Sequence, residues 1–84
     1  MKTIGLLGGM SWQSSLDYYR SINEGVLHQL GGLHSGKVIL YSLDFAAIAK
    51  LQHEGDWQGT ADILIKAALN IQAAGADFLL ICTN

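Results

Sequence analysis

The sequence has one cysteine, no proline and few charged side chains, and these shortages exclude several classes of protein. A single cysteine, Cys82, cannot form an internal disulfide, so nothing points to an oxidising compartment and a cytoplasmic location is expected. Charged residues make up 14% of the chain, against roughly 25% in an ordinary soluble domain. Part of the surface is therefore expected to be buried, by more chain or by a partner subunit.

Clusters of positive charge and long apolar runs are also missing. The five Lys and Arg residues are scattered and the formal net charge is −2, so binding to nucleic acid or to an anionic membrane is not expected. No apolar run approaches the ~18 residues of a membrane span. The apolar residues 1–10 are broken by glycines and lack a small-residue cleavage site, which disfavours a signal peptide.

Alternating apolar and helical patterns predict the order β-α-β-α-α-β. Three short runs rich in apolar residues read as strands, over residues 3–8, 37–43 and 78–82. Helical spacing predicts helices from Ser14 to Leu30, over 46–54, and from Asp56 to Gly75. Strands that alternate with helices favour a parallel sheet with right-handed crossovers. The fold class is therefore α/β, a three-stranded piece of a doubly wound, flavodoxin-like lobe, and residues 1–84 form one domain.

Local signals predict where several of these elements begin and end. Ser14-x-x-Asp17 is a helix-opening pattern, and Gly31-Gly32 can end that helix in left-handed geometry. Asp44 and Asp56 are placed to cap the two later helices. The run 78–82 is continuously apolar, which is typical of a strand covered on both faces.

Cys82 follows the last predicted strand, where an open parallel sheet binds its ligands. A lone cysteine is more often a small buried hydrophobe than a reactive thiol. At a strand end beside Thr83 and Asn84, however, a thiol facing a helix N-terminus can lose its proton more easily than a free cysteine. Both interpretations of Cys82 stay open on this evidence.

A glycine turn follows the first strand. Gly8 and Gly9, with Met10 and Ser11 after them, let the backbone approach a ligand closely, and the next helix offers free N–H groups to an anion. The spacing matches neither a dinucleotide-binding fingerprint nor a phosphate-binding loop, so a carboxylate fits better than a pyrophosphate. The alternative is that both glycines serve only a tight turn. Trp12, beside them, either fills a gap between layers or walls a pocket.

The histidines carry no metal-binding pattern. They lack metal-ligand spacing and a second cysteine to complete a site, so no metal is expected at His28, His34 or His53.

The stretches IGLLGGMSWQSSLDYYRSINE and LLICTN together closely resemble the N-terminal half of the aspartate/glutamate racemase family, and GGLHSGKVILYSLDF between them fits as well. The resemblance implies a cofactor-independent enzyme, without pyridoxal phosphate or metal, that racemises aspartate or glutamate with two cysteines on opposite faces of the substrate's α-carbon. It implies that Cys82 is the first of these cysteines. It also implies that five further residues contact the substrate: Met10, Ser11, Gln52, Thr83 and Asn84.

The sequence departs from that family after Asn84, where the family continues and carries its second cysteine. The resemblance therefore implies that this chain is the first lobe of a two-lobe enzyme. Its partners are then a small amino-acid substrate and a missing C-terminal half or second chain, and the family often forms a homodimer. Because the chemistry needs two thiols, the isolated 84-residue polypeptide is expected to be inactive.

Two alternatives come from other functional classes. The first is a small flavodoxin-like module that binds an anion or a partner and whose Cys82 is buried and structural. The second is a noncatalytic remnant whose exposed sheet edge pairs with another chain.

Overall fold

The computed structural model describes residues 1–83, and over this range its elements follow the predicted order. They are β1 (Thr3–Gly8), α1 (Trp12–Leu30), β2 (Lys37–Ser42), α2 (Phe45–His53), α3 (Trp57–Ala73) and β3 (Phe78–Ile81). The three strands form one parallel sheet in the order β2-β1-β3. The predicted α/β fold class and the parallel sheet are confirmed.

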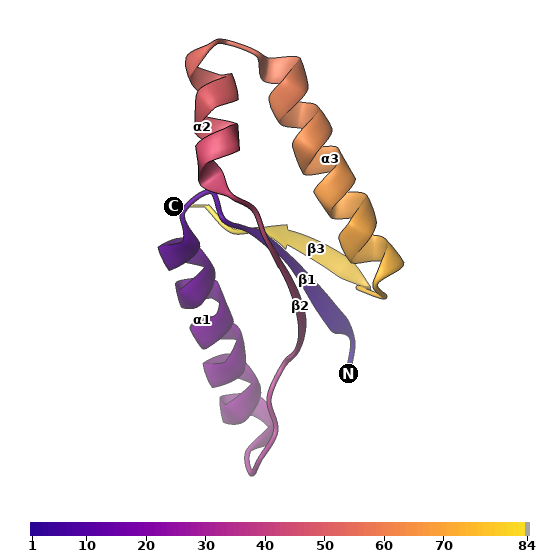
Figure 1. Ribbon diagram of the computed structural model, residues 1–84. Helices are drawn as coiled ribbons and strands as arrows, with labels where there is room; N and C mark the ends of the chain where they lie inside the picture. The colour runs from indigo at the N-terminus through magenta and orange to yellow at the C-terminus, as the bar shows by residue number, and fades with distance from the viewer. Residues whose placement is uncertain (84) are drawn as a thin grey trace.

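The first strand in the sequence lies in the middle of the sheet, and the helices lie on either side of it. Figure 1 shows α1 on one side of the sheet and α3 on the other, with α2 rising from the carboxyl edge to join α3. The register pairs Leu7 with Tyr41 on one neighbour and with Ile81 on the other. All three strands therefore end at the same edge, where the residues that follow them meet.

Short-range capping signals identified most helix ends correctly. The Asp44 carboxylate accepts a hydrogen bond from the Ala46 N–H at 3.1 Å, and Asp56 accepts one from the Gly59 N–H at 2.8 Å. Gly31 ends α1 with a φ of 68°, and its N–H donates to the Leu27 carbonyl.

The predicted start of α1 was wrong. The helix begins at Trp12 with Ser11 as its N-cap, and Ser14 lies within it and is buried. Ser14 and Ser15 therefore do not open the helix. They face the sheet, where small side chains let the first turn pack closely.

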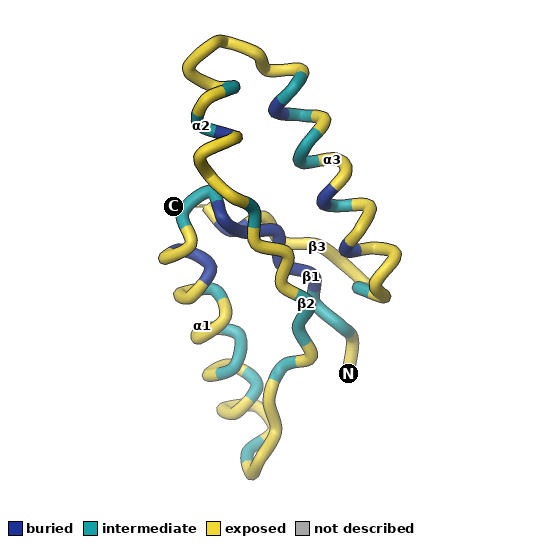
Figure 2. The backbone as a smooth tube through the Cα atoms, in the orientation of Figure 1, coloured by how far each residue is buried: buried dark blue, intermediate teal, exposed yellow. Residues whose placement is uncertain are grey.

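The buried core lies mainly between β1 and α3. Leu7, Ala67 and Ile71 form an apolar cluster, and each is no more than 1% exposed. Gly5 contributes by having no side chain, since a β-carbon there would overlap the Ile71 side chain. Figure 2 shows the buried segments along β1, the first turn of α1 and the inward side of α3.

The expectation that the third strand is covered on both faces was wrong for residues 78–81. All four residues of β3, an edge strand of the sheet, are exposed, by 37% to 49%. The apolar stripe of α1 is also half open, with exposures of 49% to 54% at Leu16, Tyr19, Leu27 and Leu30. These side chains have the composition of a core but lack its covering layer.

The dimensions of the chain agree with this open arrangement. Its radius of gyration is 14.2 Å, whereas a compact domain of this length has about 12 Å. An apolar surface of this extent is typical of a site that contacts another protein surface. Among residues 1–83, no helix combines the length and the apolar character needed to cross a bilayer.

Candidate functional site

Cys82 lies at the carboxyl edge of the sheet, beside the end of the central strand. Its N–H donates to the Leu7 carbonyl at 2.9 Å, which continues the pairing of β3 with β1 by one residue. In this register Cys82 stands alongside Gly8. Paired residues of parallel strands project to the same face, so the thiol lies on the face that Gly8 leaves empty, under α1.

Ser15, from the first turns of α1, occupies the space over Gly8. A β-carbon at Gly8 would overlap the Ser15 hydroxyl. Ser15 is only 4% exposed, and its Oγ forms no hydrogen bond of standard geometry with any group in residues 1–83. At this strand end the buried Ser15 hydroxyl and the Cys82 thiol thus lie next to Gly8, which has no side chain.

The thiol itself is fully buried. Cys82 is 0% exposed, and this burial raises the pKa of its thiol, an effect that interaction with the Ser15 side chain partly offsets. The hydroxyl acts on the sulfur without forming a hydrogen bond of standard geometry to it. The position at a strand end suggested a lowered pKa for this thiol, but its pKa is raised. The reason is that burial of the thiol away from water has a larger effect than the polar Ser15 side chain.

The glycine turn has a clear packing role. Gly9 has a φ of 96°, and a β-carbon there would overlap the backbone of Leu43, whose N–H donates to the Gly8 carbonyl at 2.8 Å. The turn after β1 is therefore clamped against the end of β2. This accounts for both glycines without a ligand, as the tight-turn alternative proposed, and anion binding at the turn remains a prediction.

The two residues after the glycines diverge. Met10 packs against the apolar cluster on the α3 side, so part of its side chain belongs to the core. Ser11 is the N-cap of α1, but its hydroxyl donates to the Gln13 side chain at 3.3 Å rather than to the helix backbone.

The remaining predicted contacts are distributed unevenly. Thr83 is exposed directly after Cys82, and Asn84 lies outside the described residues. Gln52 is exposed in the last turn of α2, the end of that helix farther from the sheet (Figure 1). The structure thus groups Gly8, Gly9, Met10, Ser11, Cys82 and Thr83 at one edge, and it does not join Gln52 to them.

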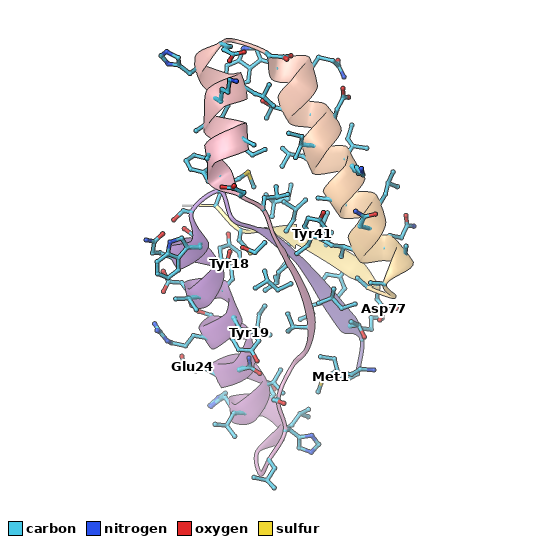
Figure 3. The ribbon with its side chains drawn as sticks, viewed as in Figure 1. Met1, Tyr18, Tyr19, Glu24, Tyr41 and Asp77 are labelled. Atoms are coloured by element: carbon cyan, nitrogen blue, oxygen red, sulfur yellow. The ribbon has the colours of Figure 1, made fainter. Side chains whose placement is uncertain are left out.

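The acidic side chain of Asp77 has a structural role at the opposite end of the sheet. Figure 3 shows Asp77 near the start of β1, close to Met1 and at the end of the sheet away from the glycine turn. Its carboxylate accepts from the Thr3 N–H at 2.6 Å. Within residues 1–83, no three or more His, Cys, Asp or Glu side chains gather in a way that could hold a metal ion.

A groove of about 310 Å³ runs beside Ser15, between α1 and β2. Trp12, 61% exposed, lies in its wall. The interpretation of Trp12 as a pocket wall therefore fits this groove. Figure 3 shows Tyr19, another residue of its lining, on the side of α1 toward β2.

Ser15 is the site residue that sequence reasoning missed. The helix-opening pattern Ser14-x-x-Asp17 spans this residue but gives it no role. One signal could have found it: a small polar residue in the first turns of a helix that follows a strand ending in glycine can pack directly on that strand end.

Comparison with known proteins agrees with this arrangement. The family model described as Asp/Glu/hydantoin racemase matches residues 7–84. A crystal structure of a candidate Asp/Glu racemase from Yersinia pestis is 56% identical, with a TM-score of 0.97 over all of this chain. An aspartate racemase homologue from Pyrococcus horikoshii OT3 is 30% identical, with a TM-score of 0.80 over the whole chain.

The chain covers 36% of the length of each of these two proteins. The similarity therefore concerns one part of a larger protein. It covers this chain over its whole length, so the glycine turn and Cys82 both lie within the matched region. The chain belongs to the Asp/Glu/hydantoin racemase family.

Proposed function

We propose that this chain forms the first lobe of a cofactor-independent racemase of acidic amino acids, aspartate or glutamate, and that Cys82 is one of its two catalytic acid/base groups. One observation carries the proposal: in a member of this family, the chain's only cysteine lies at the carboxyl edge of the sheet, against the glycine turn. That edge is where parallel sheets bind ligands.

The reaction needs one proton removed from one face of the α-carbon and another delivered to the opposite face. A Cys82 thiolate takes the α-proton, so the C–H bond breaks, an S–H bond forms, and the electron pair spreads into the substrate's carboxylate. A second thiol, supplied from outside these 84 residues, gives its proton to the other face. In the reverse direction the two sulfurs exchange roles.

The raised pKa of Cys82 suits the proton-donating half of this cycle. At neutral pH a buried thiol keeps its proton and is ready to deliver it, while its partner starts as the base. Abstraction by Cys82 in the other direction then requires groups that stabilise its thiolate.

Neutral donors are suited to the charge that develops on the substrate. The side chains of Thr83 and Asn84 and the backbone N–H groups of the turn at Gly8 and Gly9 can hold a carboxylate. Met10, Ser11 and Gln52 are proposed as further substrate contacts. A dry pocket strengthens all of these dipoles, and closing one over a substrate requires a second lobe on the exposed face.

One observation favours a different function. Cys82 is 0% exposed, as expected for a structural cysteine in a small binding module. In the racemase the thiol exchanges a proton with the substrate, whereas in the binding module it takes no part in a reaction. An activity measurement on a Cys82 variant therefore distinguishes the two functions.

The test is α-proton exchange of aspartate and glutamate in heavy water. The protein assayed is this chain together with the second lobe that the proposal requires, called the complete polypeptide below. Cys82→Ala is expected to lower the exchange rate by about a hundredfold or more, the usual contribution of a general acid or base. Ser21→Ala, an exposed position on α1, serves as the control. Exchange that continues unchanged in Cys82→Ala would reject the catalytic role and leave the binding module.

A further inference from the structure

The Ser15 hydroxyl is a buried polar group that the fold does not use. Its Oγ is shielded from solvent and has no hydrogen-bond partner within residues 1–83. Buried polar atoms are nearly always paired, because leaving one unpaired forfeits the hydrogen bonds it made to water. An orphaned hydroxyl kept in a tightly packed first turn therefore calls for an explanation.

The surroundings of Ser15 include one polar side chain on which the hydroxyl can act, that of Cys82. Gly8 beneath it has no side chain and no room for one. Cys82 stands alongside Gly8 in the continued strand register, on the same face of the sheet. The sulfur is also the group on which the Ser15 side chain acts, and burial is the other influence on its protonation.

We infer that Ser15 is a positioning residue for Cys82, whose hydroxyl is held unpaired beside the sulfur so that it donates a hydrogen bond when the sulfur ionises. This inference rests on the proposed function. It adds a group that selectively stabilises one protonation state of the catalytic sulfur.

The resting and ionised states differ in what they offer the hydroxyl. A thiol sulfur is a weak acceptor, so Ser15 gains little by turning toward it. A thiolate is a charged acceptor, and hydrogen bonds to charged groups are much stronger than those between neutral groups. Ser15 keeps its own O–H bond throughout, so it is neither acid nor base, and the proton that Cys82 takes comes from the substrate's α-carbon.

The position on α1 adds to the effect. Ser15 is the fourth residue of the helix, so the sulfur beside it lies close to the helix N-terminus. The partial positive charge at that end of the helix favours a nearby anion. The hydroxyl and the helix end thus oppose the effect of burial and allow Cys82 to act as a base as well as a donor.

Two substitutions isolate the hydroxyl. Ser15→Ala removes it and leaves the β-carbon. Ser15→Thr keeps it, and the added methyl can enter the groove of about 310 Å³ that Ser15 lines. Ser21→Ala is the matched control, an exposed serine on the same helix.

The readout is the titration of the Cys82 thiol in the complete polypeptide, followed by the NMR resonance of its β-carbon, which Cys82→Ala identifies by its loss. We expect Ser15→Ala to raise the titration midpoint by about one pH unit and to slow α-proton exchange about tenfold. Ser15→Thr is expected to restore both values, and Ser21→Ala to change neither. A purely structural role for Ser15 would leave the midpoint where it is in the wild type.

The outcomes separate this inference from the proposed function. If Cys82→Ala abolishes exchange but Ser15→Ala leaves the midpoint unchanged, the role of Ser15 is rejected and the racemase proposal stands. If Cys82→Ala leaves exchange unchanged, the racemase proposal fails, and the inference that rests on it fails too. Should Ser15→Ala not fold, a folded Ser15→Thr with a midpoint raised by as much as one pH unit would overturn the inference by itself.

Discussion

The two faces of the sheet are built for different purposes. Toward α3, Leu7, Ala67 and Ile71 form a cluster of buried apolar side chains. Toward α1, the end of the same strand presents Gly8, with Ser15 and Cys82 packed around it. The first face supplies a buried apolar cluster, and the second buries a hydroxyl and a thiol at the carboxyl edge of the sheet.

The core residue Leu7 and the glycine beside the thiol, Gly8, are neighbours on one strand. Leu7 projects to one face and Gly8 to the other, because strand side chains alternate. Disturbing the α3 face should therefore reduce stability, and disturbing the α1 face should change the behaviour of the thiol.

The largest effect is expected at Gly9, in the turn that follows β1. Gly9→Ala forces a side chain into a backbone conformation with φ of 96° and into the backbone of Leu43. The free energy of unfolding should fall by more than about 3 kcal/mol, the upper end for single substitutions, as measured by urea denaturation. The matched control is Gly25→Ala within α1, where no atom outside the adjoining helix backbone and neighbouring residues lies within 4 Å of the new β-carbon.

That control should stabilise the protein by about 0.5–1 kcal/mol, since alanine is the better helix former. A Gly9→Ala protein as stable as the Gly25→Ala protein would show that the turn is not clamped as described.

The next effect tests the α3 face. Ile71→Ala is expected to cost about 2–5 kcal/mol in unfolding free energy, because a fully buried aliphatic side chain is lost and a cavity remains. The control is Leu69→Ala on the same helix, where the side chain is 57% exposed and a much smaller loss is expected. Equal losses at the two positions would mean that α3 has no distinct buried side.

The smallest effect tests the α1 face through pH. Burial raises the pKa of the Cys82 thiol in the folded state above its value in the unfolded chain. The folded protein thus holds this proton more tightly, so the stability it contributes is complete below the unfolded pKa of about 8.5 and is lost as the pH rises through the folded pKa.

The measurement is the difference in unfolding free energy between wild type and Cys82→Ala, taken from about pH 7 to pH 10. Groups other than Cys82 titrate in both proteins and cancel. We expect the difference to shift against the wild type as the pH rises. A difference that does not change with pH would show that the thiol is no harder to ionise in the folded protein.

Elements that depend on neighbouring residues were predictable from the sequence. Asp44, Asp56 and Gly31 act on groups within a few residues, and the structure places each at the helix end predicted for it. The start of α1 was not predictable in this way, because Ser14 carries a capping pattern but is buried inside the helix.

Exposure was also beyond reach of the sequence pattern. The apolar run of β3 reads like a doubly covered strand, yet the burial of its side chains depends on what packs against each face of the sheet. Apolar composition records that a surface will be buried, but not which layer covers it.

The order of the elements, the parallel sheet and the position of Cys82 at a strand end follow from the amino-acid sequence, since periodicity and capping are local properties of a chain. The full burial of Cys82, and the position of Ser15 over the glycine that Cys82 stands beside, arise only when the chain folds, because Ser15 and Cys82 are far apart in the sequence. The physical reason is that a pKa and an unpaired hydroxyl depend on which groups are near in space and on how much water they exclude, and neither quantity exists until the strand and the helix have packed.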